Sequence, residues 1–231
     1  SMELQDMEGN KITSLDPGKS KGINVVYWNF NTSNPKMAAA KTLSFGGFTS
    51  PRASEGTYKV ILKKGKDTYE QIIETKYDSS SLSSVNERKE QEALTKELYD
   101  MVEDLAYMVY EIGTYQSTAK DVIDADGKGA KESQKYWDAL EGLRKDLVVT
   151  TGDNYVASAE PELRERMGEL YSTVATSYDM VSGALMQNYE LIKEEFATEK
   201  TRYQTIQDKE GKKFIKVLEK QEMTAPEMKS K

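Results

Sequence analysis

The chain of 231 residues contains neither cysteine nor histidine. A protein without thiols and imidazoles forms no disulfide, no zinc site of the Cys/His kind and no Ser-His or Cys-His catalytic pair. Lack of cysteine suits the cytosol, and it equally suits an exported protein stabilised by its core alone. This absence therefore excludes chemistry without fixing the compartment.

Long apolar runs are also missing. No stretch approaches the roughly 18 apolar residues that a membrane-spanning helix needs, so we expect no membrane span. No secretory signal is evident either. The opening Ser1-Met2 pair is typical of an expression-vector remnant, so any native signal could have been cut away.

Charge is unevenly distributed along the chain. Residues 1–77 carry 11 Lys/Arg and 8 Asp/Glu, a net of +3, and residues 78–231 carry 21 and 31, a net of −10. Nucleic acid requires a basic face, which an acidic helical half does not supply. We expect no nucleic-acid partner.

Motifs for metal or phosphate binding fail on inspection. Residues 124–129 (DADGKG) open like a calcium loop, but Lys128 and Lys135 occupy positions five and twelve, where oxygen ligands are needed. We therefore interpret this segment as a helix-ending turn and expect no metal. Neither a phosphate-binding loop nor a Gly-x-Ser-x-Gly motif occurs.

Carboxylate pairs remain as the last route to catalysis. The 39 acidic residues make such pairs unavoidable, and glycoside hydrolysis needs only two carboxyl groups at a suitable separation. An acid for that reaction needs a pocket that raises its pKa, and the sequence indicates none. We expect no cofactor and no enzymatic activity in this chain.

The strongest signal that is present is a heptad stripe between residues 94 and 123. Its apolar positions step by 4 and 3 in strict alternation, which places them on one side of an α-helix. They are Leu94, Leu98, Met101, Leu105, Met108, Ile112, Tyr115, Ala119 and Val122. A helix from Val85 to Asp124 is predicted, with Ser84 and Glu87 forming a capping box at its start.

Three further amphipathic helices are predicted after this one. They cover about 130–149, a stretch from Pro161, and a stretch from Ser182-Gly183 through Ile206 that continues past Gly211. The positions expected to face inward are Trp137, Leu140, Leu143 (or Arg144) and Leu147; Leu163, Met167, Leu170, Val174 and Val181; and Leu185, Tyr189, Ile192, Phe196, Tyr203 and Ile206. We expect an up-down four-helix bundle over residues 85–222 with a frayed tail at 223–231. The alternative is an intermolecular coiled coil.

The first 77 residues alternate with period two instead. Ile23–Phe30 and Thr57–Lys63 read as strands, the second returning as a hairpin through Tyr69–Thr75. Another hairpin is expected between Leu4–Met7 and Lys11–Ser14. We predict an immunoglobulin-like antiparallel β-sandwich over 1–77, joined by a serine-rich linker at 78–84 to the helices. The fold class is α+β with two domains.

Aromatic side chains divide into two groups. Trp28 is expected in the sandwich core, and the helical tyrosines, Tyr178 among them, are expected to pack on or beside the seams. Phe45, Phe48 and Arg52 lie on a glycine-containing loop, where apolar and Arg side chains can anchor a partner surface. They are the candidate partner- or ligand-binding residues, the alternative being that the loop folds back on itself.

Two motifs carry a family resemblance. Gly22–Phe30 (GINVVYWNF) and Glu55–Leu62 (EGTYKVIL) resemble the G-x-N-x-x-x-W-(D/N) and P-G-x-Y-x-V-x-L patterns that follow the propeller in bacterial sortilin-like, BNR-repeat proteins, often described as glycosyl hydrolases. This chain departs from the pattern at Asn31, where Arg is common, and at Ser54-Glu55, where Pro is usual before Gly56.

The resemblance implies an accessory region and transfers no catalytic residue. In that family a sandwich and a helical region follow the propeller, so the implied role is non-catalytic docking on the propeller of the same parent chain, outside the cytoplasm. A carbohydrate- or cell-surface-binding module is the alternative, and part of a glycoside hydrolase site is the third. As a fragment, the chain is expected to be a monomer.

Overall fold

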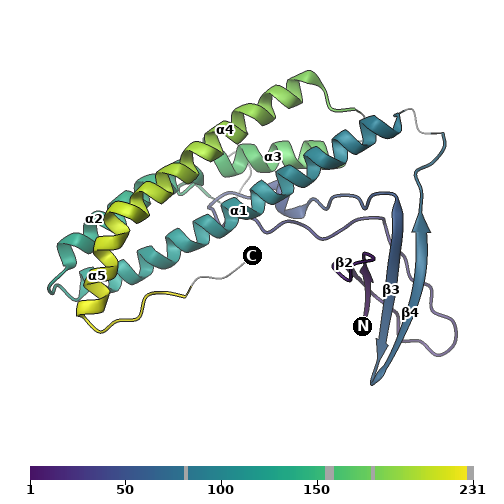
Figure 1. Ribbon diagram of the computed structural model, residues 1–231, viewed down its shortest axis with the longest axis horizontal. Helices are drawn as coiled ribbons and strands as arrows, with labels where there is room; N and C mark the ends of the chain where they lie inside the picture. The colour runs from purple at the N-terminus through teal and green to yellow at the C-terminus, as the bar shows by residue number, and fades with distance from the viewer. Residues whose placement is uncertain (81–82, 154–158, 178–179, 228–231) are drawn as a thin grey trace. The chain divides into compact units, whose positions relative to one another are not determined.

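The computed structural model describes residues 1–80, 83–153, 159–177 and 180–227. Four expected features lie partly or wholly outside these residues: the linker (at 81–82), the loop at 150–160, the tail and Tyr178. The fold is mixed α and β, as expected (Figure 1). It divides into two compact units, which we call the sheet unit (1–34, 48–96 and 174–181) and the helical unit (35–47, 97–173 and 182–231).

The sheet unit contains a four-stranded antiparallel sheet in the order β2-β1-β3-β4. Its strands are β1 (Met2–Gln5), β2 (Lys11–Leu15), β3 (Gly56–Lys64) and β4 (Asp67–Thr75). Leu4 pairs with Val60 of β3 and is fully buried. Because alternate residues of a strand share a face, Leu4 and Val60 lie on the face that also carries Tyr58. That face contributes Leu4 and Tyr58 to the core of the unit, and Ile61 is buried on the opposite face.

Both predicted hairpins are confirmed, and each depends on a glycine in its turn. Gly9 and Gly65 have φ angles of 92° and 63°, a region that L side chains rarely adopt. The first turn is further fixed by Asp6, whose Oδ1 accepts hydrogen bonds from the backbone amides of Glu8 (2.9 Å) and Asn10 (2.8 Å). The side-chain amide of Asn10, which donates to Asp6 Oδ2 (2.8 Å), and these backbone hydrogen bonds hold the pKa of Asp6 below its ordinary value.

The strand predicted at Ile23–Phe30 is wrong, because no ladder includes these residues. Nearby, one isolated bridge joins Asn31 to Arg52. Alternating apolar residues specify which faces are buried, but a strand also needs to pair with a neighbouring edge, and in the described part of the chain these residues pair with none. The described residues thus show one sheet. Trp28, expected in a sandwich core, is half-buried against Tyr58, with ring centroids 5.6 Å apart.

The first helix, α1, runs from Val85 to Asp124 as predicted. The capping box is confirmed: the Glu87 amide donates to Ser84 Oγ (3.3 Å) and the Ser84 amide donates to Glu87 Oε2 (2.6 Å). Every stripe residue is buried except Tyr115, which is half-buried. A further column, one residue along from the stripe and also buried, comprises Thr95, Val102, Val109 and Gln116.

The remaining helices are α2 (Ala130–Leu147), α3 (Leu163–Thr176), α4 (Gly183–Ile206), a π-helical turn at Gln207–Gly211, and α5 (Lys212–Lys220). Most expected inward residues are buried. Trp137 is a correction: it is half-buried, and the neighbouring Tyr136 is fully buried. Tyr136 is spaced from Leu140 and the rest of the α2 seam by the 4–3 steps of a heptad, whereas Trp137 is not. Leu185, Tyr203 and Ile206 are half-buried, and Val181 lies outside the helices.

Contacts between α1 and α4 correct the expected topology. Lys193 Nζ donates to Glu97 Oε1 (2.7 Å), Lys200 Nζ to Asp104 Oδ2 (3.3 Å) and Tyr203 OH to Glu111 Oε2 (3.0 Å). The partners advance together along both helices, so α1 and α4 are parallel (Figure 1). An up-down bundle of four helices would make its first and fourth helices antiparallel, so that part of the prediction is wrong.

The reason is that α2 and α3 follow one another in the same direction. Along α4 and its continuation, Glu195 contacts Arg166 of α3, Arg202 contacts Asp146 of α2, and Gln207 contacts Tyr136 of α2. After α2 the chain does not turn back: Val148 is extended and buried, and the Val149 carbonyl accepts from the Lys41 amide (2.9 Å). The helical unit therefore has three rows, namely α1, α2 with α3, and α4 with α5.

Candidate interaction surface

The loop expected to bind a partner forms a single 3₁₀ turn, Phe45–Phe48. The phenyl rings at its two ends are largely exposed, with 64% of Phe45 and 71% of Phe48 accessible to solvent. Residues three apart in a 3₁₀ turn lie on the same side of it. The turn thus displays two aromatic side chains, the residue type that anchors many protein interfaces.

Two glycines of this turn are closely packed, Gly46 against α3 and Gly47 against Met37. A Cβ at Gly46 would lie 3.0 Å from the Cα and the carbonyl oxygen of Gly168, and a Cβ at Gly47 would lie 2.9 Å from Cγ of Met37. Only hydrogen fits at these positions without displacing a neighbour. The backbone of the turn is therefore held in direct contact with the helix, and Phe45 points outward from a rigid base.

A buried arginine holds the segment that leads into the turn. Arg164 of α3 is buried, and its Nε donates to the Ala38 carbonyl and its Nη1 to the Thr42 carbonyl, both at 2.9 Å. Its charge is paired with Glu165, which also accepts from Thr42 Oγ1 (2.8 Å). The sequence offered no signal for this role, since Arg164 follows an unremarkable helix start.

Arg52 is placed apart from Phe45. It forms the β-bridge with Asn31, and the flanking backbone is tied by the Thr32 amide to the Pro51 carbonyl (2.8 Å) and the Ala53 amide to the Phe30 carbonyl (2.7 Å). Arg52 and Phe48 belong to the sheet unit, whereas Phe45 belongs to the helical unit. The three predicted residues are thus not assembled within one unit.

Sequence reasoning missed a second exposed apolar feature, the run Ile23–Phe30. Ile23, Val25 and Tyr27 are 95%, 69% and 83% exposed, whereas the intervening Val26 and the following Trp28 are half-buried. The alternation that predicted a strand correctly marked two faces. It could not indicate that the outer face has no covering layer.

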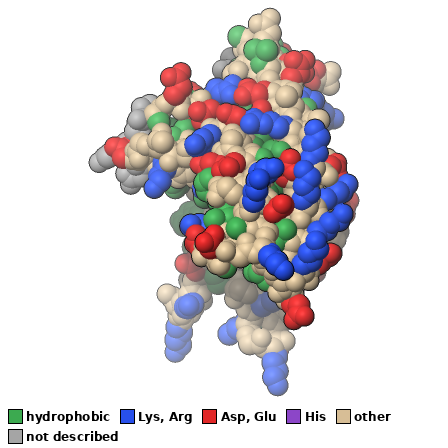
Figure 2. Space-filling model, turned by 90° about the vertical axis from the view of Figure 1, so that its left-hand side faces the viewer, with side chains coloured by type: hydrophobic (Ala, Val, Ile, Leu, Met, Phe, Trp, Pro, Cys, Tyr) green, Lys and Arg blue, Asp and Glu red, His purple; other side chains and the backbone are tan. Residues whose placement is uncertain are grey.

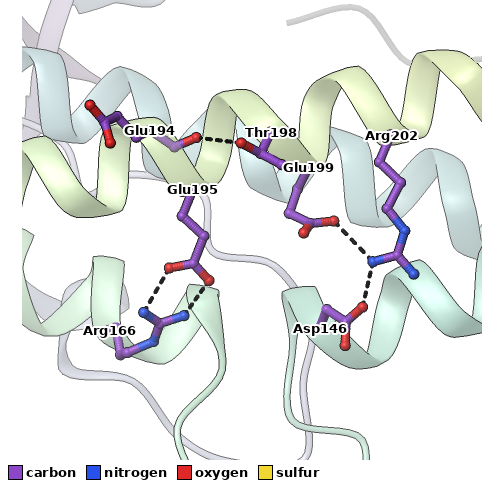
Figure 3. A network of polar contacts seen from close by, with 7 residues as sticks. All are labelled: Asp146, Arg166, Glu194, Glu195, Thr198, Glu199 and Arg202. Atoms are coloured by element: carbon purple, nitrogen blue, oxygen red, sulfur yellow. Dashed lines mark hydrogen bonds and ion pairs between the residues drawn. The ribbon is translucent and has the colours of Figure 1, made fainter.

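Charged side chains of the helical unit pair with one another. Arg166 donates to both carboxylate oxygens of Glu195 (2.8 and 2.5 Å), and Arg202 contacts Asp146 (2.5 Å) and Glu199 (3.3 Å), as Figure 3 shows. Elsewhere, burial, assisted by the charge of Asp146, raises the pKa of Glu162. Among the described residues no cluster of three acidic side chains is arranged to hold a metal ion.

Buried and half-buried tyrosines of the helical unit supply hydrogen-bond donors. Burial raises the pKa of Tyr136, Tyr171 and Tyr203 well above the ordinary value of a phenol. The hydroxyl of Tyr136 donates to Gln207 Oε1 (2.7 Å) within the π-helical turn. These phenols stay protonated at neutral pH, so they serve as hydrogen-bond donors inside the helical unit.

Figure 2 shows one face of the surface of the helical unit. Acidic and basic side chains are interspersed over the face shown in Figure 2, and hydrophobic side chains appear there in small groups. An open hollow of about 450 Å³ lies along α4, lined by Met186, Gln187, Glu190, Leu191 and Glu194. One helix provides all of its walls, so it does not enclose a ligand. Within the described residues, no helix is both long and apolar enough to span a membrane.

Comparisons with protein-family models, curated proteins and solved structures gave no match to this chain.

Proposed function

We propose that this chain is a non-catalytic interaction module in which the Phe45–Phe48 turn contacts the partner. The observation that carries the proposal is the display of exposed aromatic side chains on a turn in which Gly46 is packed against Gly168 of α3 and Gly47 against Met37. A contact residue that is already held in place loses little conformational freedom on binding, which favours affinity.

The ion pairs within the helical unit indicate that the helices act as a scaffold. Bidentate Arg166–Glu195 and the Asp146–Arg202 contact tie α3 and α2 to α4. The helices thus act as a scaffold that keeps the segment before the turn in position through Arg164.

The proposed context is the C-terminal region of a larger secreted bacterial propeller protein. The motifs Gly22–Phe30 and Glu55–Leu62 support this context, and the partner is then the propeller of the same parent chain. In this proposal the observed sheet is part of an immunoglobulin-like sandwich, and the helices form a bundle of three rows. The location is outside the cytoplasm.

Binding to the parent propeller tests the proposal. The chain should retain a separately expressed propeller domain in a pull-down, and Phe45→Ala with Phe48→Ala should reduce the affinity at least tenfold, since each exposed ring at an interface centre contributes about 1–2 kcal/mol. Leu191→Ala removes an exposed apolar side chain on α4 and serves as the matched control. Binding that is absent, or that ignores the double substitution, rejects the proposal.

A carbohydrate- or cell-surface-binding module is the second candidate. The exposed phenyl rings favour it, because aromatic faces stack on sugar rings. A glycan array probed with the chain should give hits that disappear with Phe48→Ala. An array without hits, together with propeller binding, decides for the first candidate. Turnover of aryl-glycosides by the chain alone would revive the hydrolase reading.

A further inference from the structure

The run Ile23–Asn29 presents backbone groups without partners in the described part of the chain. No strand or bridge includes these residues, and no backbone hydrogen bond to another segment is recorded for them. Their φ angles avoid the left-handed region. Unpaired donors and acceptors alternating along such a run are a template for strand pairing.

Both ends of this run are fixed. At the start, Asn24 Oδ1 accepts from the Ser20 amide and Nδ2 donates to the Ser20 carbonyl, both at 3.0 Å. At the end, Phe30 has a φ of 59°, its carbonyl accepts from Ala53, and its ring lies 4.9 Å from that of Trp28. Because the run is held at both ends, it loses little further conformational freedom when it pairs as a strand with another edge.

The sheet offers a second unpaired edge, the outer side of β4. Because β4 is last in the strand order, one edge of its nine residues lacks a neighbour in the described sheet. Tyr69 and Ile72 are half-exposed on it. The strand carries Asp67, Glu70 and Glu74 and no basic residue.

The two edges are complementary in charge and length. Residues 17–54 contain no acidic residue, and Lys19 and Lys21 directly precede the run. The seven extended residues Ile23–Asn29 fit within the nine of β4. Two β4 edges facing each other would oppose three acidic side chains with three more, which is unfavourable, whereas the uncharged run preceded by Lys19 and Lys21 brings no acidic side chain to β4.

We propose that two copies of this chain form a two-fold dimer in which Ile23–Asn29 of each copy adds as an antiparallel strand to β4 of the other. A reciprocal exchange of this kind is self-complementary and closes at two copies. It places Val25 and Tyr27 beside the side chains of β4 and pairs the backbone of the run with the outer edge of β4. The dimer replaces the monomer expected from the sequence and does not depend on the role of Phe45 and Phe48.

Light scattering and sedimentation of the intact chain from 1 µM to 1 mM provide the test. Wild type should reach twice the monomer mass, with a dissociation constant that rises at least tenfold between roughly 50 and 500 mM salt. Glu70→Lys with Glu74→Lys should raise that constant at least tenfold, as should Lys19→Glu with Lys21→Glu. The chain carrying all four substitutions should recover to within threefold of wild type.

Glu190→Lys with Glu194→Lys makes an equal charge change on α4 and should leave the constant unchanged. Amide hydrogen exchange supplies the backbone readout: residues 25–29 should become protected at concentrations where the dimer forms. A monomer at 1 mM overturns the proposal. So does a dimer indifferent to the β4 reversal, or protection of residues 25–29 that is equal at all concentrations and therefore intramolecular.

Discussion

Gly46 lies so close to Gly168 of α3 that a Cβ added to Gly46 would be 3.0 Å from the Cα and the carbonyl oxygen of Gly168. Neither glycine has a left-handed φ angle, so the constraint is steric and does not come from backbone conformation. The contact connects the 3₁₀ turn to the helix that carries Arg164. The contribution of this contact to stability can be measured by adding a methyl group at Gly46.

Replacing Gly46 with Ala should destabilise the chain by about 1–3 kcal/mol, because the backbone of Gly168 must move to admit the methyl group. Gly113 in α1 is the control, since a Cβ there meets no atom within 4 Å. Gly113→Ala should stabilise by about 0.5–1 kcal/mol through helix propensity alone. Urea unfolding measures both, and equal effects of the two substitutions would contradict the steric account.

Loss of the capping box should weaken the start of α1. Ser84→Ala removes the acceptor for the Glu87 amide and should cost about 1 kcal/mol. Amide hydrogen exchange at residues 85–90 should accelerate more than exchange in the middle of the helix. Ser79→Ala, a serine of the same linker outside the capping box, should change neither the unfolding free energy nor the exchange rates.

The Arg166–Glu195 pair should contribute modestly. Its side chains are 41% and 37% exposed, so solvent screens the attraction despite the bidentate geometry. A double-mutant cycle with Arg166→Met and Glu195→Gln should give a coupling of about 0.5–1 kcal/mol that shrinks as salt is raised. The pair Lys120–Asp124, 62% and 61% exposed, should couple by less than about 0.5 kcal/mol. A coupling above 2 kcal/mol for the first pair would refute this reading.

Stability should fall at alkaline pH because buried phenols must ionise when the chain unfolds. Burial, assisted by the charge of Glu103, raises the pKa of Tyr99 to about 12, whereas a free phenol has a pKa of about 10. A folded-state pKa above the unfolded value stabilises fully below pH ~10, and that stabilisation is lost as the pH rises from about 10 to 12.

Urea unfolding between pH 8 and 11.5, with absorbance of the phenolate, checks this expectation. Tyr99→Phe should flatten part of the alkaline decline, because Phe has no proton to lose. Tyr69→Phe changes an exposed phenol of β4 and should leave the decline as it is. A flat stability profile up to pH 11.5 would count against buried, protonated tyrosines.

Local signals in the sequence predicted local structure well. The extent of α1 was predictable because its heptad stripe and its capping box both lie within the helix and its cap. The hairpins were predictable from glycine turns between alternating runs. In α2, two adjacent aromatic residues competed for the core, and only the 4–3 steps from Tyr136 to Leu140 and Leu143 separate them.

Non-local choices were not predictable. The direction of α3 depends on where the chain goes after Val149, and nothing in the helix patterns records it. The pairing of Ile23–Phe30 depends on a neighbouring edge, which alternation does not encode. The glycine-rich loop made Phe45 and Phe48 candidates, but the hydrogen bonds of Arg164 to Ala38 and Thr42 join residues more than 120 positions apart.

The parallel arrangement of α1 and α4 has a consequence for the order of folding. Glu97 and Lys193 are 96 positions apart, whereas Gln116 and Glu141, which join α1 to α2, are 25 apart. Closing the longer chain loop costs about 1 kcal/mol more in entropy. The α1–α2 hairpin can therefore assemble while the rest of the chain is still being synthesised. Until α4 and α5 have been synthesised and have packed, the apolar side of α1 that faces them is exposed to solvent.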